Sequence, residues 1–321
     1  MLTSFVCNKK TITCNLSRQD LAKILWEKDS LVWVDLDDPS EFESEILIEL
    51  FNFHPLAIED CLNDSSEPKI DDYEDHLFLV VHAVNGRSAE ELKTIELDIF
   101  VSKNYVVTFH KQPVQSISQF RDLLAKKSDT FMTEGSDMLL HTILDRLVDR
   151  YLPVIADQER KIDIIEEKIF SENKDNVLPS ILKIQKDVIY LKRIIAPQQE
   201  TVGNLSRSAR SFIKPKNMVY FKDIYDHLFR YYQMTEQLHS LLTGILQVYF
   251  SHVSTKLNEV IKTMTVIATI GIPPTVIASI YGMNFKHMPE LYWEWGYFFS
   301  LGLMTLSSAI ILIYMKIKKW F

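Results

Sequence analysis

The sequence has few cysteines and less basic than acidic charge, and each shortage excludes a class of protein. Its 3 cysteines, Cys7, Cys14 and Cys61, are odd in number and show no CxxC spacing. Neither a disulfide framework nor a zinc finger is therefore indicated, and we expect buried, reduced thiols. The 43 Asp and Glu residues against 35 Lys and Arg residues give a formal net charge of −8. Such a chain repels nucleic acid, because no basic cluster with interleaved aromatic residues offsets the negative charge.

Motifs of catalysis and nucleotide binding are also missing. The chain contains no GxxxxGK(S/T) phosphate loop, so ATP is not the evident source of energy. It contains no HExxH, GxSxG or GxGxxG either, and isolated acidic pairs on charged helices are weak indications of catalysis. We therefore expect a protein that is not an enzyme and that uses no organic cofactor.

Uncharged runs long enough to cross a membrane occur in the last part of the chain. Thr263–Phe285 and Trp295–Met315 both reach the ~20 residues that a helix needs to cross a bilayer core. The first thirty residues lack the basic, apolar and small-residue pattern of a cleaved signal peptide, so we expect the bulk of the protein to stay where it is made. Both termini are expected in the cytoplasm because basic residues flank both runs. These residues are Lys256, Lys262, Lys316, Lys318 and Lys319.

The pattern of charge and hydrophobicity predicts an α+β membrane protein with an N-terminal α/β domain, a long helical stalk and two C-terminal transmembrane helices. The predicted segments are a cytoplasmic α/β domain (1–112), antiparallel long cytoplasmic helices (113–217), a stalk helix (218–262), the first transmembrane helix (263–285), an external loop (286–294), the second transmembrane helix (295–315) and a basic cytoplasmic tail (316–321).

Periodicity predicts the individual elements of the first two segments. Alternating and β-branched runs indicate strands at Leu31–Asp37, His76–Val84, Thr94–Val101 and Tyr105–His110. Helical spacing and capping residues indicate helices at Arg18–Glu27, Glu41–Phe51 and Pro55–Leu62. Two long helices are expected further on, at Ser136–Phe170 and from about Leu178 to Arg193 or beyond.

A third long helix is predicted to begin near Met218 and to meet no proline before Pro273. Its roughly 55 residues would extend about 80 Å, far more than a membrane span, so its first part should project from the bilayer as a stalk. Small and polar side chains recur on one face of this helix at steps of three and four. They belong to the stripe Gln247, Ser251, Ser254, Asn258, Ile261, Thr265, Ala268, Ile272, Thr275 and Ser279.

A polar stripe has two explanations. Polar groups in lipid lose hydrogen bonds to water at a cost of a few kcal/mol each, so these side chains should face protein or water. Tight helix packing through small residues is one possibility, although Asn258 and Gln247 fit it poorly. The other is a water-filled path. Two spans cannot enclose one, so conduction would require a homo-oligomer with the positions from Asn258 to Ser279 lining its axis, where Ile261 and Ile272 form apolar rings that can gate by dewetting.

The first span contains two prolines and ends on a distinctive tetrapeptide. Pro273 and Pro274 remove two backbone donors, so we expect the helix to bend there, either as a hinge or only to improve packing. The span closes on Tyr281-Gly282-Met283-Asn284. Gly282 can take a positive φ and Asn284 tolerates one. Taken alone, the tetrapeptide is therefore explained by an ordinary helix C-cap.

The residues that follow favour a more specific interpretation. Gly282-Met283-Asn284 at the end of the first of two C-terminal spans, followed by Met288-Pro289-Glu290-Leu291, an aromatic Tyr292–Trp295 and a basic tail, resembles the CorA family of magnesium transport proteins. The resemblance covers essentially the whole chain. It implies a funnel-shaped homopentamer in the cell (inner) membrane that admits Mg²⁺ and, in many members, cobalt or nickel. Its expected partners are further copies of itself, membrane lipid and divalent cations.

The resemblance also implies roles for particular residues. Gly282, Met283 and Asn284 match the selectivity motif, with five Asn284 amides around the outer mouth. Because Mg²⁺ dehydrates reluctantly, a ring of neutral carbonyl oxygens can hold the hydrated ion through its waters. The membrane potential can drive influx, since a divalent cation gains ~4.6 kcal/mol per 100 mV.

A passive channel needs a mechanism that closes it. The resemblance implies that Mg²⁺ closes the channel when it is bound between the cytoplasmic domains of adjacent subunits. The segments Ile58–Leu62 and Tyr220–His227 resemble those that supply it in the family. Solvated surface carboxylates are the alternative explanation of these residues. The residues expected to bind the regulatory ion are Asp60 and Asp223, with Glu59 and His227 assisting.

Other features fit the family less well. Gln247 stands at the inner mouth where some relatives carry an acidic residue, and Ile272 replaces a methionine. Glu159 and Asp163 form a weaker candidate metal site, for which a solvated helix face is the alternative.

Two other functions stay open. One is a zinc transporter on the same scaffold, which Met283 disfavours because zinc-transporting relatives vary this position. The other is a membrane-tethered cytoplasmic sensor or enzyme, which the polar stripe disfavours.

Overall fold

A computed structural model describes residues 1–8, 11–25, 27, 30–63, 67–85, 92–126, 131–170, 177–207, 212–318 and 320. The chain forms two compact units, Met1–Gly244 and Ile245–Phe321. Lys319 of the predicted basic tail lies outside the described residues.

The unit Met1–Gly244 is built around one sheet, which has seven strands in the described part of the chain. Strands β3 and β7 pair in parallel, and the other neighbouring strands pair antiparallel. The strands follow the order β2-β1-β3-β7-β6-β5-β4, and they are β1 (Leu2–Asn8), β2 (Thr11–Cys14), β3 (Ser30–Asp37), β4 (Lys69–Asp72), β5 (Leu77–Val84), β6 (Thr94–Val101) and β7 (Tyr105–His110). The four predicted strands are confirmed as β3, β5, β6 and β7.

Three strands were not predicted from the sequence, and each has a weak pattern. β1 lies between β2 and β3 and is buried over most of its length, so it lacks the alternation of a half-exposed strand. β2 and β4 have 4 residues each and form the two edges of the sheet. Short and polar edge strands are common because a long apolar edge would pair with other chains.

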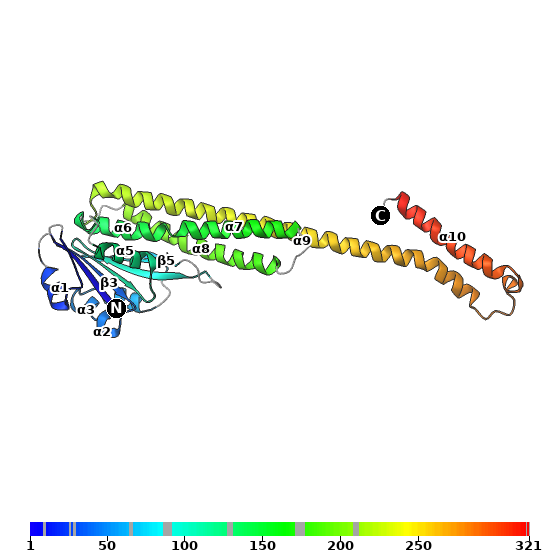
Figure 1. The fold of residues 1–321 in the computed structure, drawn as a ribbon, viewed down its shortest axis with the longest axis horizontal. Helices are drawn as coiled ribbons and strands as arrows, with labels where there is room; N and C mark the ends of the chain where they lie inside the picture. Colours follow the sequence, from blue (N-terminus) through cyan, green and yellow to red (C-terminus); the bar gives the residue numbers. More distant parts are fainter. Residues whose placement is uncertain are drawn as a thin grey trace. The chain divides into compact units, whose positions relative to one another are not determined.

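Short helices cover one face of the sheet (Figure 1). They are α1 (Arg18–Ile24), α2 (Glu41–Ser44), α3 (Ile46–Glu49) and α4 (Pro55–Leu62). Leu21, Leu47 and Ile58 from these helices join Val34 and Phe100 of the sheet in one buried core. This core fixes α4, which carries Glu59 and Asp60, against the sheet.

Two predicted helices in this layer differ from the structure. The helix predicted at Arg18–Glu27 ends at Ile24, where the Ser30 hydroxyl donates a 2.8 Å hydrogen bond to the Ile24 carbonyl and so satisfies a terminal acceptor. The helix predicted at Glu41–Phe51 is divided at Glu45 into α2 and α3.

Longer helices follow the sheet. They are α5 (Gln115–Ala125), α6 (Ser136–Val148), α7 (Tyr151–Phe170) and α8 (Val177–Arg207), with a 3₁₀ turn at Phe131–Thr133. The single helix predicted over Ser136–Phe170 is wrong, because the chain breaks between Val148 and Tyr151. Pro153 explains the break, since its ring would clash with the carbonyl of Asp149 in a continuous helix. α7 and α8 pack along each other (Figure 1).

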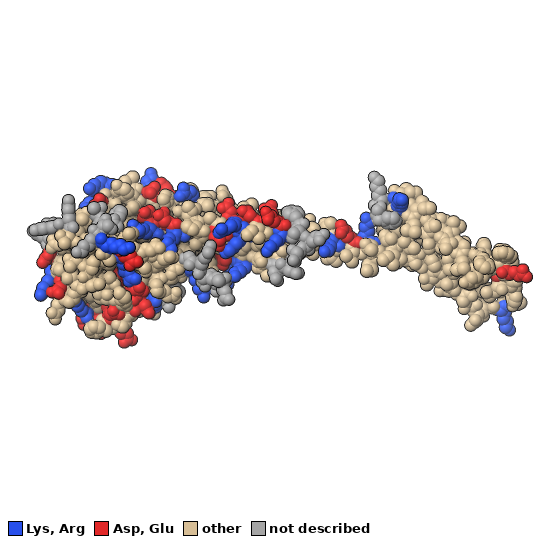
Figure 2. Space-filling view, in the orientation of Figure 1, with Lys and Arg blue, Asp and Glu red and all other residues tan. Residues whose placement is uncertain are grey.

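The predicted third long helix is confirmed as α9, which runs from Met218 to Tyr281 after a 3₁₀ turn at Pro215–Asn217. In the unit Ile245–Phe321 it is followed by a 3₁₀ turn at Pro289–Tyr292 and by α10 (Gly296–Ile317). Mean hydropathy reaches 1.6 in α9 and 2.0 in α10, and almost none of the residues in these apolar stretches is buried. The face drawn in Figure 2 is nearly free of charged side chains along both stretches. Their length and composition suit two membrane spans.

Candidate functional site

The predicted pore-lining residues share one exposed face of α9. Ile261 and Ile272 are 56% and 58% exposed, and Asn258, Thr265, Ala268, Thr275 and Ser279 are exposed as well. Half-buried residues recur on a different face, at Val266, Ile270, Pro273 and Ile277. That face meets α10, since the Ser308 hydroxyl of α10 donates a 3.2 Å hydrogen bond to the Ile270 carbonyl. At 100° per residue the two faces lie nearly opposite, so α10 leaves the polar stripe uncovered.

Three hydroxyl groups of the stripe are oriented by the helix itself. Thr265, Thr275 and Ser279 each donate to the backbone carbonyl four residues earlier, at 2.8, 2.8 and 2.7 Å. Their protons therefore point back along the helix, and their oxygen lone pairs remain as acceptors on the exposed face. Water bound to a cation presents its hydrogens outward, so such a face accepts hydrogen bonds from a hydrated cation.

The end of α9 carries the predicted selectivity motif. The Gly282 amide donates to Ala278 at 2.9 Å and the Met283 amide to Ile280 at 3.2 Å, so the helix tightens as it ends. Among the described residues, Gly135 is the glycine with a positive φ, and neither Gly282 nor Asn284 adopts one. The helix thus ends where the sequence indicated, but without the positive φ that Gly282 and Asn284 would permit. Space matters more than φ at Gly282, because an added Cβ would lie 3.2 Å from the Ala278 carbonyl oxygen.

Asn284 follows this tightened turn and is exposed. Among the described residues, no other group of the chain forms a hydrogen bond with its side-chain amide. The amide oxygen is therefore available to a ligand or to solvent.

Pro274 leaves a backbone carbonyl of α9 without its helical donor, and Ser308 donates a hydrogen bond to it. Pro274 has no amide hydrogen, so the Ile270 carbonyl four residues earlier loses its helical partner, yet α9 stays helical through both prolines. The Ser308 hydroxyl donates to this carbonyl from α10. An unsatisfied carbonyl inside a membrane is costly, and serines of neighbouring helices commonly compensate for proline.

We predict that Ser308→Ala lowers the free energy of unfolding of the full-length protein in detergent by about 1 kcal/mol, because the Ile270 carbonyl loses its donor. Ser307→Ala is the matched control, since the Ser307 hydroxyl donates within α10 to the Met304 carbonyl at 2.9 Å. Chemical denaturation of both variants measures the difference. Equal stability of the two variants would show that the Ser308 bond to α9 contributes nothing.

The predicted regulatory residues lie on two elements of the first unit. Glu59 and Asp60 lie in the last turn of α4, where Asp60 accepts a 2.6 Å hydrogen bond from Lys69. Burial lowers the pKa of Lys69, but its hydrogen bonds to Asp60 and Asp71 outweigh burial and raise it overall. A cation that binds Asp60 must therefore compete with a charged lysine.

Asp223 and His227 lie one turn apart on α9, with their side chains 3.9 Å from each other. The described residues of one chain do not bring Asp60 into a group of ligands with these two side chains. The regulatory pair of Asp60 and Asp223 therefore stays a prediction.

His227 instead meets two carboxylates that were not predicted. Possible ligand atoms of Asp145, Asp149 and His227 all lie within 4.8 Å of one another. Burial, followed by the charge of Asp149, raises the pKa of Asp145, while burial lowers the pKa of the neighbouring His141. The i, i+4 spacing of Asp145 and Asp149 could have identified these two residues as a pair. Their contact with His227 could not be predicted from the sequence, because His227 lies far away along the chain.

The weaker predicted pair lies elsewhere. Glu159 and Asp163 are exposed on α7, and no third possible ligand joins them among the described residues. Figure 2 shows other acidic side chains spread over the same long helices. These acidic neighbours favour the explanation that Glu159 and Asp163 belong to a solvated helix face. Their role as a metal site stays a prediction.

Comparisons with known proteins agree with this architecture. The model of the family described as CorA-like Mg2+ transporter protein matches residues 28–318. The Bacillus subtilis protein YfjQ is 35% identical over 289 residues, which are 90% of this chain and 89% of that protein. The Cobalt/magnesium transport protein CorA of Thermotoga maritima is 33% identical over 273 residues, 85% of this chain and 78% of that protein.

A solved structure matches the whole fold. The complete structure of the CorA magnesium transporter from Methanocaldococcus jannaschii superposes with a TM-score of 0.87 and covers 100% of this chain and 99% of that chain, at 20% identity. The fold therefore comprises an N-terminal α/β domain, a long helix and two C-terminal apolar helices of a membrane protein. Together with the sequence matches, it establishes that the chain belongs to the family of CorA-like Mg2+ transporter proteins.

Proposed function

We propose that this chain is one subunit of a homopentameric channel that carries Mg²⁺ into the cell across the inner membrane, with both termini in the cytoplasm. The observation that carries the proposal is the polar stripe of α9, which lies opposite the face bonded to α10 and leads to Gly282, Met283 and Asn284. Its relative in Thermotoga maritima is named a cobalt/magnesium transport protein, so cobalt is a further candidate substrate. The resemblance to the family adds nickel as another candidate.

The selectivity step follows from the exposed amide of Asn284. Five copies of this residue around an axis would present neutral oxygens to the waters of a hydrated cation. A neutral ring binds Mg²⁺ weakly enough to release it, whereas a carboxylate ring would hold the ion more strongly. Below the ring, the hydroxyl lone pairs of Thr265, Thr275 and Ser279 accept hydrogen bonds from the same waters, and Ile261 and Ile272 form apolar constrictions.

Regulation follows from the acidic groups of the first unit. We place a regulatory Mg²⁺ between Asp60 of one subunit and Asp223 of the next, assisted by Glu59 and His227. The crowding of Asp145 and Asp149 against His227 adds negative charge beside Asp223. When Mg²⁺ is scarce, these like charges repel across the interface, and the subunits loosen and open the pore.

Magnesium uptake into proteoliposomes under an inside-negative potential tests the function. We expect uptake that depends on the protein and on the potential, and that persists without a proton gradient. Protein-free liposomes and the same measurement with Zn²⁺ are the controls. Uptake of Zn²⁺ alone would identify a zinc transporter on this scaffold, and the absence of any flux would favour a membrane-tethered sensor.

A further inference from the structure

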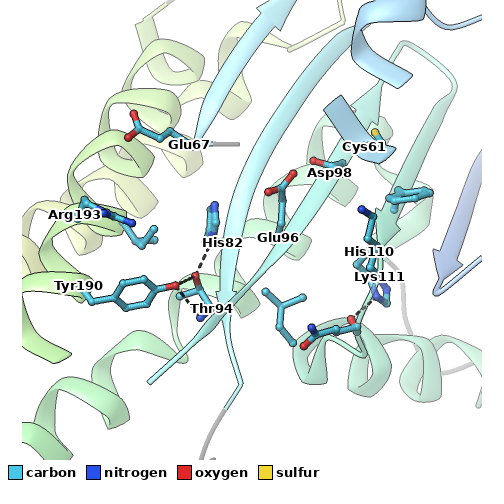
Figure 3. Close-up of a pocket in the computed structure, with 14 residues that line it drawn as sticks. Cys61, Glu67, His82, Thr94, Glu96, Asp98, His110, Lys111, Tyr190 and Arg193 are labelled. Carbon is cyan, nitrogen blue, oxygen red and sulfur yellow. Dashed lines mark hydrogen bonds between the residues drawn. The ribbon is translucent and has the colours of Figure 1, made fainter. Parts of the chain in front are cut away.

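A cavity of about 380 Å³ lies in the first unit, apart from every residue discussed above as a metal ligand (Figure 3). Strands β5, β6 and β7 form its floor, α8 forms one wall and the end of α4 contributes Cys61. Pockets for organic ligands are mostly apolar, but this lining is mostly polar. The cavity is lined by 14 residues, and the apolar ones are Ile95, Phe109 and Ile194.

Asp98 is the most buried acidic side chain of the lining. It is 2% exposed, and its Oδ1 atom has no hydrogen-bond partner. The Cys61 thiol forms a hydrogen bond with the Asp98 carboxyl group, and burial followed by the charge of Asp98 raises the pKa of this thiol, which stays protonated. A buried carboxyl oxygen without a hydrogen-bond partner costs free energy. A cation or a hydrogen-bond donor bound in the cavity at this atom would remove that cost.

Further negative charge surrounds Asp98. Glu96 lies two residues earlier on β6, so its side chain points to the same face, and Figure 3 shows the two carboxyl groups beside each other. Burial, followed by the charges of Glu96 and Asp60, raises the pKa of Asp98, while Lys111 opposes the shift. Lys111 itself donates a 2.7 Å hydrogen bond to the Leu62 carbonyl, at the end of α4.

Acidic side chains outnumber lysine and arginine in the lining. The acidic residues are Glu67, Glu96 and Asp98, the basic ones are Lys111 and Arg193, and His82 and His110 also line the cavity. A bound cation would offset the charge of Glu96, which otherwise helps to raise the pKa of Asp98.

We propose that this cavity binds one hydrated divalent cation inside a single subunit, with Asp98 and Glu96 as its anionic contacts. Mg²⁺ typically keeps several waters and is held by one or two carboxylates. A water molecule occupies about 30 Å³, so the cavity has room for the ion with its six waters.

The geometry argues against a dehydrated transition metal. Among the described residues, no three His, Cys, Asp or Glu side chains of the cavity bring ligand atoms within 4.8 Å of one another. Direct coordination by several side chains, which such ions prefer, is therefore not preformed. Waters of a hydrated ion would bridge the longer distances to the carboxylates.

This site differs from the proposed regulatory site and does not depend on the transport function. Asp60 and Asp223 require a neighbouring subunit, whereas Asp98 and Glu96 lie on one strand. Asp60 and Cys61 point about 100° apart on α4, and the two cavities that they line have no lining residue in common.

Iron-directed cleavage of the full-length protein in detergent tests the proposal. Fe²⁺ replaces Mg²⁺ at many sites and, with ascorbate and peroxide, cuts the backbone close to where it is bound. We expect cuts between residues 94 and 98, identified by mass spectrometry, that excess Mg²⁺ suppresses. Asp98→Asn and Glu96→Gln should each reduce these cuts at least about tenfold, because each removes one charged contact.

A second variant separates this site from the interface. Asp60→Asn combined with Asp223→Asn should leave the cuts between residues 94 and 98 in place. Glu96 is half-buried, so Glu96→Gln decides the question if Asp98→Asn fails to fold. No cuts in this segment of the wild type, cuts that persist in both cavity variants, or cuts that disappear with the interface variant would each overturn the proposal. Because the readout is cleavage and not flux, a protein without transport activity can still pass this test.

Discussion

Asn284→Ala is expected to reduce Mg²⁺ uptake into proteoliposomes at least ~100-fold while the protein still folds. One hydrogen bond contributes about 1 kcal/mol, and the loss recurs in every subunit of the proposed pentamer, so the ion loses roughly 5 kcal/mol at the outer mouth. That energy corresponds to on the order of a thousandfold in binding. Because Asn284 is exposed and bonds no other described group, its replacement should not disturb the end of α9.

Two further variants make this test specific. Asn284→Gln keeps the amide on a longer side chain, so we expect partial uptake, between that of the wild type and the alanine variant. Asn204→Ala is the matched control, since Asn204 is an exposed asparagine of α8 in the other unit. Uptake at the wild-type level by Asn284→Ala would remove the amide ring from the mechanism.

The strands were predicted where the sequence itself carries their pattern. The buried run of β5 and the paired runs of β6 and β7 are visible in the sequence because they are long and rich in β-branched residues. β4 was missed because it reads KIDD and its partner β5, not its own side chains, makes it a strand. The break before α7 could have been predicted from Pro153, whose effect on a preceding carbonyl is local.

In the candidate site, too, features within one element were predictable from the sequence, and contacts between elements were not. The polar face of α9 follows from helical spacing within one element, so the sequence alone places its residues on one face. Contacts between elements were not predictable in this way. Ser308 reaches Ile270, and His227 reaches Asp145, only because folding brings separate helices together. The end of α9 shows a different limit, because glycine permits a positive φ without requiring one.

Asp60→Lys combined with Asp223→Lys should make Mg²⁺ transport insensitive to internal Mg²⁺. Each replaced carboxylate removes a charge-assisted contact worth about 1.5–3 kcal/mol. The concentration of internal Mg²⁺ that half-inhibits uptake should therefore rise at least ~10-fold. The two lysines also repel each other across the interface, which favours the loosened, open state without any change in the ion. Uptake measured at a series of internal Mg²⁺ concentrations gives the comparison.

The controls separate ion binding from the loss of existing ion pairs. Asp60 and Asp71 both accept hydrogen bonds from Lys69, at 2.6 and 3.0 Å, so Asp71→Lys disturbs the same lysine without removing a proposed ligand. Asp226→Lys places the same new charge on an exposed position of α9, three residues from Asp223. Both controls should keep the inhibition by Mg²⁺. If they lose it as the double variant does, charge on this surface in general, and not an ion held by Asp60 and Asp223, sets the closed state.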